Sequence, residues 1–490
     1  MIVLDGATLG VADVVAVARS RERVELSADA RARNEATWTA IANRLARGGA
    51  LYGATTGVGA LRDQVIAEAD REKFQWNLLR SHAVSAGRPL SVELVRAGMA
   101  VRANQLGAGG AGVVPELLDA LVIALNEGIT PYVRELGSLG TGDLSALAEV
   151  ALALVGEGVV WPEGADAAPV AARPVVGPVR LGRRDAVGFM SSNAFTGGHA
   201  ALLCVDARAL EDARLSVAAL SFEALEADPV VLDERVSAAR GAPGQAAVAT
   251  RMRELLSGAA VVPTAPDRMV QDPYPFRVLP QVDGVSHDAL GVLESAVVRE
   301  LNARPENALI VGDGLALPNG NFYAAELGAA LDALRSALAH SASLIAARVS
   351  AMIDPRMTGL PRFLAERPGP ESGVMMLEYT AHSAAAEIRS LAMPMGTQSV
   401  WASLGVEAHA SLAATSARRT TEALSMLRIL TATELVVAVR ALALSGRVPA
   451  GAGTRRLFMR AREALPAGPE DRAFGLDVEA ACRVIDGLVE

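Results

Sequence analysis

Two stretches of the sequence decide the fold: HAALLCVDARALEDARLSVAALSFEALEA at residues 199–227 and AAELGAALDALRSALAHSASLIAARVSAMI at residues 324–353. Each keeps nearly unbroken helical periodicity over its whole length. Helices of this length usually bury their apolar faces by packing into a bundle or supercoil. The sequence therefore predicts a mainly α-helical protein with a long-helix bundle as its core.

The rest of the chain is predicted to form two further parts around this bundle. Residues 1–184 alternate helical periodicity with glycine-rich loops, and we expect them to form an N-terminal active-site domain. Residues 185–440 are the central bundle, and residues 441–490 are a small C-terminal helical tail. The stretch VPELLDALVIALNEG (114–128) predicts a helix that stops at its glycine. The prolines of APDRMVQDPYPFRVLPQ (265–281) exclude a helix throughout that segment.

Composition excludes several classes of function. The 490 residues are 51% hydrophobic with few aromatics, which suits closely packed helices. The net charge of −9 is spread along the chain and provides no basic stripe for a nucleic acid. Lys73 is the only lysine and lies in the charged run EADREKF. A pyridoxal-phosphate enzyme needs a Schiff-base lysine, so this sequence argues against one.

Targeting and metal signals are weak. The N-terminus lacks the basic start and long apolar core of a signal peptide. The most hydrophobic helix candidate, LSALAEVALALVGEGVVW (144–161), contains two glutamates and is too short to span a bilayer. Cys204 and Cys482 are expected to be buried free thiols, and the histidines show no metal-ligand spacing. We therefore expect a cytoplasmic protein with no membrane partner and no metal.

The loop GSLGTGDL (137–144) combines three glycines and two hydroxyl residues with an acid that begins an apolar helix. Asp143 is predicted to cap the free amides of that helix. The Gly140-Thr141-Gly142 tripeptide is flexible enough for the Gly142 amide to attack the Gly140 carbonyl. Cyclisation and dehydration would then give an imidazolone. On this stretch alone, a plain loop with a helix cap is the simpler interpretation.

Two other loops carry candidate catalytic groups. LYGATTGVG (51–59) places Tyr52 at the head of a glycine-rich loop, where a phenol with nearby cations could act as a base. VQDPYPFR (270–277) offers an amide, a phenol and a guanidinium from Gln271, Tyr274 and Arg277. Arg277 suits a bidentate grip on a substrate carboxylate, although a structural salt bridge would explain it equally well.

Together these stretches resemble the histidine and aromatic amino-acid ammonia-lyase family, in order, over roughly residues 45 to 415. YGATTGVG is similar to the family's YGxNTGFG, with Thr55 where the family usually has asparagine. RSHAVSAG, VQDPYPFR, LNARPENALI, NGNFYA and VEAHASL resemble further family motifs. These motifs supply His82, Gln271, Tyr274, Arg277, Asn302, Asn307, Phe322, Glu407 and His409.

The resemblance implies a helical homotetramer whose active sites draw residues from three subunits. It also implies a self-made electrophile, 4-methylidene-imidazol-5-one, formed from Ala-Ser-Gly in a GSxGASGDL loop, with no external cofactor. In such lyases the electrophile captures the substrate, and the residue matching Tyr52 removes a β-proton as ammonia leaves. Arg277 would hold the substrate carboxylate, and His82 would line the substrate pocket.

The match breaks around the electrophile. GSLGTGDL is one residue shorter than the family loop. If the gap falls inside the triad, no middle residue remains to become the methylidene carbon. If it falls earlier, the triad is Gly140-Thr141-Gly142, and dehydration of Thr141 would leave a hindering methyl group. Ser191 replaces the family's supporting asparagine in GFMSSNA, and the nearest amide moves to Asn193.

Three functions are consistent with this pattern. The first is a C–N lyase or aminomutase acting on an aromatic or other amino acid through a modified electrophile. The second is an electrophile-free enzyme that uses Tyr52 for enolisation, as in cyclisation of a biosynthetic intermediate, with the Asp143 helix end as an oxyanion site. The third is a pseudoenzyme or assembly subunit, which would have no need of either Tyr52 or Arg277. The sequence favours an enzyme.

Overall fold

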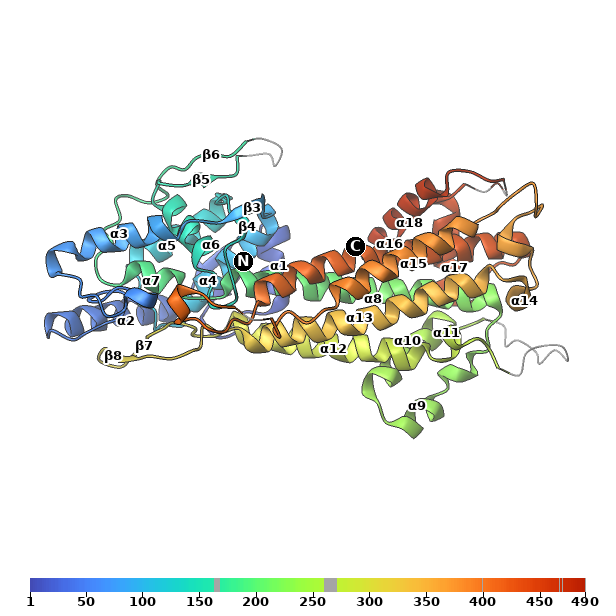
Figure 1. Cartoon of the computed structure of the whole chain (residues 1–490), viewed down its shortest axis with the longest axis horizontal. Coiled ribbons are helices and arrows are strands. Elements are labelled where there is room, and N and C mark those ends of the chain that lie inside the picture. The colour runs from blue at the N-terminus through green and yellow to red at the C-terminus, as the bar shows by residue number, and fades with distance from the viewer. Residues whose placement is uncertain (163–167, 260–270, 399, 467, 469, 490) are drawn as a thin grey trace. The chain divides into compact units, whose positions relative to one another are not determined.

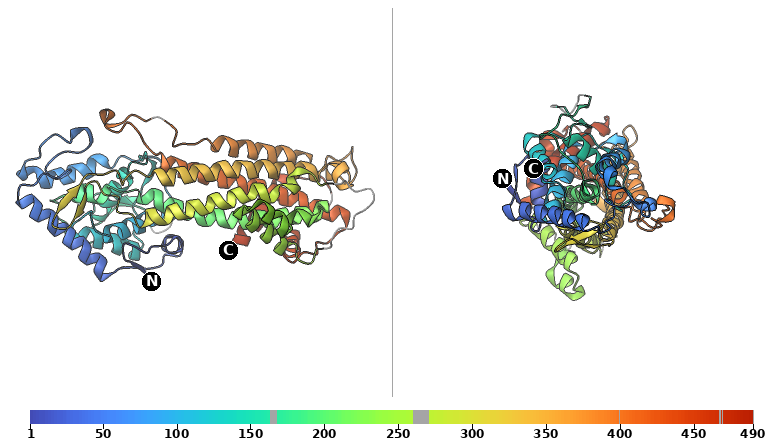
Figure 2. Two further views of the ribbon diagram at one scale, coloured as in Figure 1. Left: turned by 90° about the horizontal axis from the view of Figure 1, so that it is seen from below. Right: turned by 90° about the vertical axis from the view of Figure 1, so that its left-hand side faces the viewer.

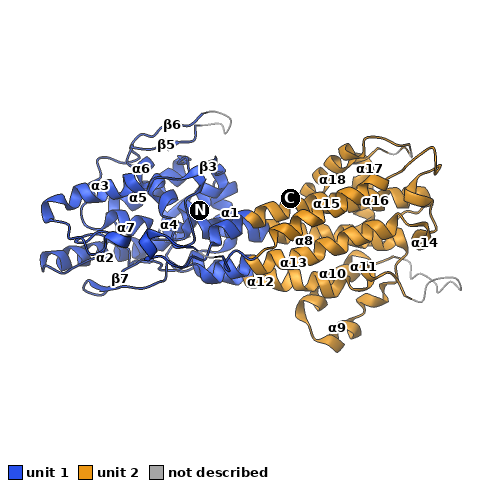
Figure 3. Cartoon of the chain, in the orientation of Figure 1, with its two compact units in different colours: residues 1–205, 293–331, 394–418 blue, residues 206–292, 332–393, 419–490 orange. Residues whose placement is uncertain are grey.

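The computed structural model describes residues 1–162, 168–259, 271–398, 400–466, 468 and 470–489 (Figure 1). The chain forms two compact units, each assembled from three separate segments (Figure 3). Unit 1 comprises residues 1–205, 293–331 and 394–418, and unit 2 comprises residues 206–292, 332–393 and 419–490. The predicted division at residues 184 and 440 stays a prediction.

Unit 1 contains the N-terminal helices and all of the described short strands. Its strands form four two-stranded sheets, of which β1–β2 is parallel and the other three are antiparallel. Its elements are β1 Ile2–Leu4, α1 Val11–Arg19, β2 Val24–Leu26, α2 Ala28–Ala46, η1 Gly59–Leu61, η2 Glu68–Asp70, α3 Arg71–His82, β3 Ala86–Pro89, α4 Val92–Gly107, α5 Pro115–Glu127, β4 Arg134–Leu136, α6 Leu144–Leu154, β5 Val159–Val160, β6 Val170–Ala171, α7 Asp185–Met190, β7 Leu309–Val311, β8 Leu315–Leu317 and η5 Ser403–Gly405.

Among the described residues of unit 2, helices joined by loops are the named secondary-structure elements. Four long helices have residues in both units: α8 Ala194–Leu225, α12 Leu279–Leu301, α13 Ala325–Met352 and α16 Ala413–Ser445. Within unit 2 the long helices run alongside one another in the views of Figures 1 and 2. The other elements are η3 Pro229–Leu232, α9 Glu234–Arg240, α10 Pro243–Leu255, α11 Tyr274–Arg277, α14 Pro355–Thr358, η4 Arg362–Leu364, α15 Met375–Leu391, α17 Ala452–Ala464 and α18 Phe474–Val489.

The helices expected from periodicity are present. Helices α8 and α13 cover the two long stretches, so the mainly α-helical prediction is confirmed. Helix α5 begins at Pro115 and ends before Gly128, whose φ of 74° is left-handed as a C-terminal stop requires. In the proline-rich stretch, residues 265–270 lie outside the described residues, and the remainder contains the short helix α11 and the start of α12.

Helix α4 is the centre of unit 1, and every residue from Val95 to Gly107 is buried. Its apolar side chains pack among α1, α2 and α5. Its buried arginines donate to backbone carbonyls: Arg96 to Val17 O over 2.9 Å, and Arg102 to Phe189 O over 3.0 Å. A buried guanidinium is tolerated only when its donors are used, so these bonds fix how α4 sits among its neighbours.

Unit 2 contains a fully buried ion pair between α13 and α16. Arg348 Nε and Nη2 donate to the two carboxylate oxygens of Glu434 over 2.6 and 2.9 Å, and neither side chain is exposed. Ser221 Oγ on α8 donates to the same carboxylate over 2.8 Å. The pair therefore ties three of the long helices to one another inside unit 2.

We predict that Glu434→Gln destabilises the protein by about 3–5 kcal/mol, because it leaves the buried Arg348 charge uncompensated. Urea and thermal unfolding measure the effect. The matched control is Glu93→Gln, which breaks a half-exposed 3.1 Å pair with Arg19 and should cost less than about 1 kcal/mol. Equal losses in the two variants would contradict the prediction.

Candidate active site

A cavity of about 330 Å³ in unit 1 collects several of the residues expected from the sequence. Tyr52, His82, Thr141, Ser191, Phe322 and Glu407 all line it, although they lie far apart in the sequence. The cavity is mixed in character, with aliphatic side chains between the polar ones. Its other lining residues are Val58, Gly59, Ala60, Leu61, Leu78, Leu144, Val187, Met190, Asn307 and Ser403.

The loop after Leu51 fixes the Tyr52 side chain. The Gly59 N–H donates to the Tyr52 phenol oxygen over 2.8 Å. Thr55, which stands where the family has asparagine, accepts from the Leu51 amide over 2.8 Å. Gly53 has a φ of 72°, and a Cβ there would lie 2.5 Å from a Val187 methyl, so the loop requires glycine at that position. The phenol oxygen is thus held beside the cavity by an N–H donor that also stabilises negative charge on it.

Arg184 supports this loop from behind, and sequence reasoning missed it. Its guanidinium is fully buried and donates to the Tyr52 carbonyl over 3.1 Å and to the Asn307 carbonyl. Burial lowers the pKa of Arg184 to about 10, so the group keeps its charge at neutral pH. The only sequence signal was an arginine pair before a helix, which does not show what the side chain contacts.

The Gly140–Gly142 tripeptide is held by two side chains. Ser411 Oγ donates to the Gly140 carbonyl over 2.8 Å, and the Gly142 N–H donates to Asn193 Oδ1 over 3.1 Å. Asn193 Nδ2 donates onward to the Phe322 carbonyl over 2.7 Å. Gly140 and Gly142 are buried beneath the cavity, and Thr141 between them lines it.

The loop does not fit the standard Ala-Ser-Gly electrophile. Gly140 has a φ of 80°, and a Cβ there would lie 2.1 Å from Ser411 Oγ and 2.9 Å from the Ala413 amide. The alanine of the family triad therefore has no room at this position. Thr141 replaces the serine, and its hydroxyl donates to Glu407 Oε2 over 3.4 Å. The serine side chain that would supply the methylidene carbon is therefore absent from this loop.

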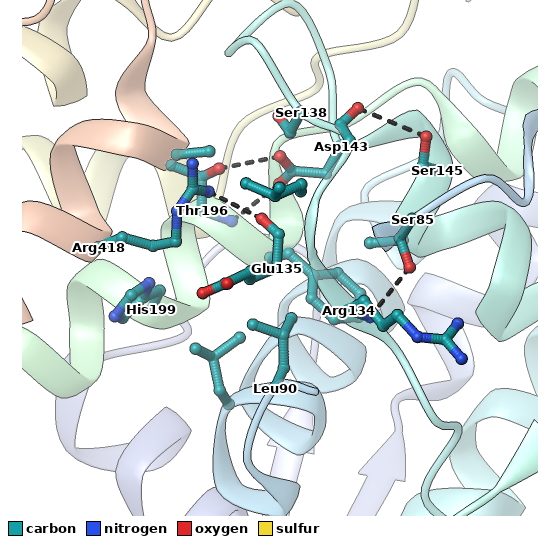
Figure 4. Close-up of a pocket in the computed structure, with 16 residues that line it drawn as sticks. Ser85, Leu90, Arg134, Glu135, Ser138, Asp143, Ser145, Thr196, His199 and Arg418 are labelled. Atoms are coloured by element: carbon teal, nitrogen blue, oxygen red, sulfur yellow. Dashed lines mark hydrogen bonds between the residues drawn. The ribbon is translucent and has the colours of Figure 1, made fainter. Parts of the chain in front are cut away.

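Asp143 does not cap its own helix, contrary to the expectation from sequence. Its carboxylate instead accepts from the Thr196 N–H and hydroxyl over 2.8 and 2.9 Å, at the start of α8. Burial raises the pKa of Asp143. Figure 4 shows Asp143 and Thr196 beside a small cavity of about 50 Å³ behind the loop, with His199 and Arg418 nearby. Asp143 thus joins the loop to α8.

His82 and Glu407 are two further polar residues that line the cavity with Tyr52 and Thr141. His82 Nδ1 contacts the Leu78 carbonyl at 2.9 Å. Burial lowers the pKa of His82, so its ring is neutral at physiological pH, and a proton on Nδ1 leaves Nε2 as an acceptor. Glu407 is half-buried and exchanges backbone hydrogen bonds with Ala402.

The LNARPENALI motif contributes its second asparagine to the cavity. Asn307 lines it, and the Asn307 N–H donates to Ser191 Oγ over 3.2 Å. Asn302 does not line it: its amide bonds the Leu9 N–H and carbonyl, each over 2.9 Å. Sequence spacing alone could not distinguish the two residues, because both motif positions carry the same side chain.

Gln271, Tyr274 and Arg277 lie together in unit 2 and do not line this cavity. Arg277 Nη1 donates to Gln271 Oε1 over 2.6 Å, and its guanidinium lies 5.0 Å from the centre of the Tyr274 ring. Tyr274 is 68% exposed. Among the described residues no carboxylate forms an ion pair with Arg277.

The described part of the chain contains no group of three side chains arranged to hold a metal ion. Nor does any of its helices combine the length and apolarity needed to cross a membrane. Cys204 and Cys482 are both buried, as expected, and neither forms a disulfide.

The fold and this cavity together define an enzyme of the ammonia-lyase type. The sequence matches the aromatic amino acid lyase family over residues 9–463, and the chain belongs to that family. It is 36% identical to histidine ammonia-lyase of Geobacillus thermodenitrificans over 484 residues, which cover 98% of this chain and 96% of that protein. It is 35% identical to histidine ammonia-lyase of Treponema denticola, over 99% of this chain and 96% of that protein.

Solved structures give the same family. The ergothioneine-degrading enzyme ergothionase of Treponema denticola, in complex with desmethyl-ergothioneine sulfonic acid, superimposes with a TM-score of 0.94 at 28% identity and covers 99% of both chains. Tyrosine aminomutase of Streptomyces globisporus gives a TM-score of 0.92 at 27% identity, over 100% of this chain and 96% of that one. The chain is therefore a lyase-type enzyme, and the pseudoenzyme interpretation is not supported.

Glu300, near Asp143 and Asn193, is a second buried acid that sequence reasoning missed. Its Oε1 is buried without a hydrogen-bond partner, although the residue as a whole is partly exposed. Burial, and then the charge of Asp143, raises the pKa of Glu300 to about 7. The folded state therefore binds this proton more tightly than the unfolded chain does.

We predict that Glu300→Gln stabilises the protein at alkaline pH. A carboxyl whose folded pKa lies above its unfolded value contributes stability at low pH, and this is lost as pH rises through about 7. The variant should match the wild type near pH 4.5 and exceed it above pH 7, by ~1–2 kcal/mol after allowance for partial exposure. Thermal unfolding across this pH range measures the difference. A difference in stability between the variant and the wild type that stays the same at every pH would contradict the prediction.

Proposed function

We propose that the protein is a C–N lyase that eliminates a tertiary amine from the quaternary ammonium group of an amino-acid betaine and needs no electrophile to do so. One observation carries the proposal. The loop that would build the electrophile has lost the alanine and serine side chains, while Tyr52 and Glu407 still line the same cavity. The comparison with ergothionase supports it, because that enzyme is an ergothioneine-degrading enzyme.

The chemistry of the leaving group explains why the electrophile is dispensable. In the proposed elimination, Tyr52 takes the β-proton, and the C–H electron pair becomes the new double bond. The C–N bond breaks, and the amine leaves with its electron pair. A quaternary ammonium has no lone pair with which to add to an electrophile. It departs directly as a neutral tertiary amine and needs no proton, so the base is the principal catalyst required.

The cavity suits such a cation. The Glu407 carboxylate and the rings of Tyr52 and Phe322 line it. Carboxylates attract a quaternary ammonium electrostatically, and aromatic faces attract it through the ring quadrupole. Leu61 and Met190 provide apolar surface for methyl groups that cannot hydrogen-bond. A volume of about 330 Å³ accommodates a substrate the size of an amino acid.

The carboxylate of the substrate needs a separate partner, and we propose Arg277 for it. Arg277 belongs to unit 2, whereas the cavity belongs to unit 1. The family resemblance implies a homotetramer with composite sites, so Arg277 of a second copy would complete the cavity. Gln271 orients the guanidinium on one side and leaves other N–H groups for a bidentate grip.

An ammonia-lyase or aminomutase with a modified electrophile from Gly140-Thr141-Gly142 is the second candidate. The bonds from Ser411 to the Gly140 carbonyl and from Gly142 to Asn193 favour it, because both suit ring closure of the backbone. Enolisation and cyclisation of a biosynthetic intermediate would also need only Tyr52, but no contact in the cavity favours it over elimination.

We predict that the purified protein has the mass of its encoded chain. Intact-mass measurement, with peptide mapping across residues 134–150, should show no loss of water at Gly140–Gly142, because the threonine loop does not fit the standard group. A deficit of two water molecules in that peptide would establish the second candidate instead.

We predict that the enzyme releases a tertiary amine from ergothioneine or a related histidine betaine, and little ammonia from histidine. Tyr52→Phe removes the base and should lower kcat/KM by about 10²–10⁴-fold. Amine release and absorbance of the conjugated product measure both. The matched control is Tyr379→Phe, an exposed tyrosine in unit 2, which should keep full activity. Ammonia release from histidine or tyrosine without betaine turnover would refute the proposal.

A further inference from the structure

Two loops that are distant in sequence meet beside the cavity. The short helices η1 (Gly59–Leu61) and η5 (Ser403–Gly405) pack against each other. The Ala60 N–H donates to Ser403 Oγ over 3.1 Å, and both residues line the cavity. One hydroxyl therefore connects the tyrosine loop to the loop that leads to Glu407.

Each end of this connection lies next to a group with a proposed role in the reaction. On one side, the N–H of Gly59, the residue before Ala60, donates to the Tyr52 phenol oxygen over 2.8 Å. On the other side, Ala402 and Glu407 exchange backbone hydrogen bonds of 2.9 and 3.3 Å. Ser403 thus lies between the turn that holds the Glu407 backbone and the turn that holds the Tyr52 oxygen.

The backbone at this contact is unusual. Ser403 and Leu404 have φ values of 51° and 54°, a left-handed conformation that residues with a side chain rarely adopt. A Cβ at Gly59 would lie 2.7 Å from Ser403 Oγ, and Gly59 is itself left-handed at 55°. Close approach of the two loops therefore depends on glycine on one side and a strained serine on the other.

We propose that Ser403 is a positioning residue for the elimination, whose hydroxyl locks the two loops together and so fixes the Tyr52 oxygen relative to the Glu407 carboxylate. This proposal rests on the proposed function for the roles of Tyr52 and Glu407. The competing explanation is that Ser403, which lines the cavity, contacts the substrate directly. Loss of positioning lowers kcat with little change in KM, whereas loss of a binding contact raises KM.

Steady-state kinetics of Ser403→Ala and Ser403→Asn separate the two explanations. Alanine removes the acceptor, and we expect kcat to fall about 10–100-fold while KM changes less than about threefold. Asparagine tolerates a left-handed backbone, and its amide oxygen can replace the lost acceptor. We therefore expect kcat of Ser403→Asn to be about tenfold higher than that of Ser403→Ala. The control is Ser425→Ala, which removes an exposed hydroxyl bonded only to the Thr421 carbonyl of its own helix and should change neither constant.

Hydrogen exchange tests the lock without any substrate. In Ser403→Ala the amides of residues 57–64 should exchange about tenfold faster or more, because Ala60 loses its acceptor and the loop opens more often. In Ser425→Ala they should exchange as in the wild type. Unchanged exchange in Ser403→Ala, or a raised KM with normal kcat, overturns the proposal. Absence of betaine turnover by the wild type would instead count against the proposed function and leave the exchange result intact.

Discussion

Buried guanidinium groups hold unit 1 together, and the shape of the cavity depends on them. Arg102 on α4 donates to the Phe189 carbonyl over 3.0 Å and to Glu306 over 3.2 Å. Arg184 donates to the carbonyls of Tyr52 and Asn307. A desolvated guanidinium is stable only while its donors are satisfied, so these carbonyls cannot move independently. These carbonyls belong to segments that line the cavity. The geometry of the site therefore depends on the same hydrogen bonds that hold the core together.

Sequence periodicity was sufficient for the fold because the long helices bury a repeating apolar stripe. It was less informative for α4, where buried arginines interrupt the apolar pattern and every face is covered. A period-based argument assumes one solvated face, and a helix buried all round has none. The prediction that Asp143 caps its own helix was wrong because a carboxylate at the start of one helix can accept hydrogen bonds from another helix. Here the carboxylate of Asp143 accepts from Thr196 of α8.

Much of the cavity was predicted from motifs, since Tyr52, His82 and Glu407 each lie in a short pattern of their own. What the sequence could not show was how separate segments meet. Ser403 carries no motif, and its contact with Ala60 joins positions far apart in the chain. Arg277 was expected to hold the substrate carboxylate, and the sequence did not show that it belongs to unit 2. Both are facts of tertiary arrangement, which local patterns do not encode.

The altered loop is best understood through what an electrophile does for an amine. A primary amine must be made into a better leaving group, and a group that bonds covalently to the substrate does so. A quaternary ammonium group already leaves as a neutral tertiary amine, so under the proposed function the same scaffold can lose the electrophile and retain its base. At Gly140 the chain closes against Ser411, and the Thr141 hydroxyl turns to Glu407. A broken triad beside an ordered tyrosine and acid is therefore what a change of leaving group would produce, and a decayed site would have no reason to keep the tyrosine oxygen bonded to the Gly59 amide.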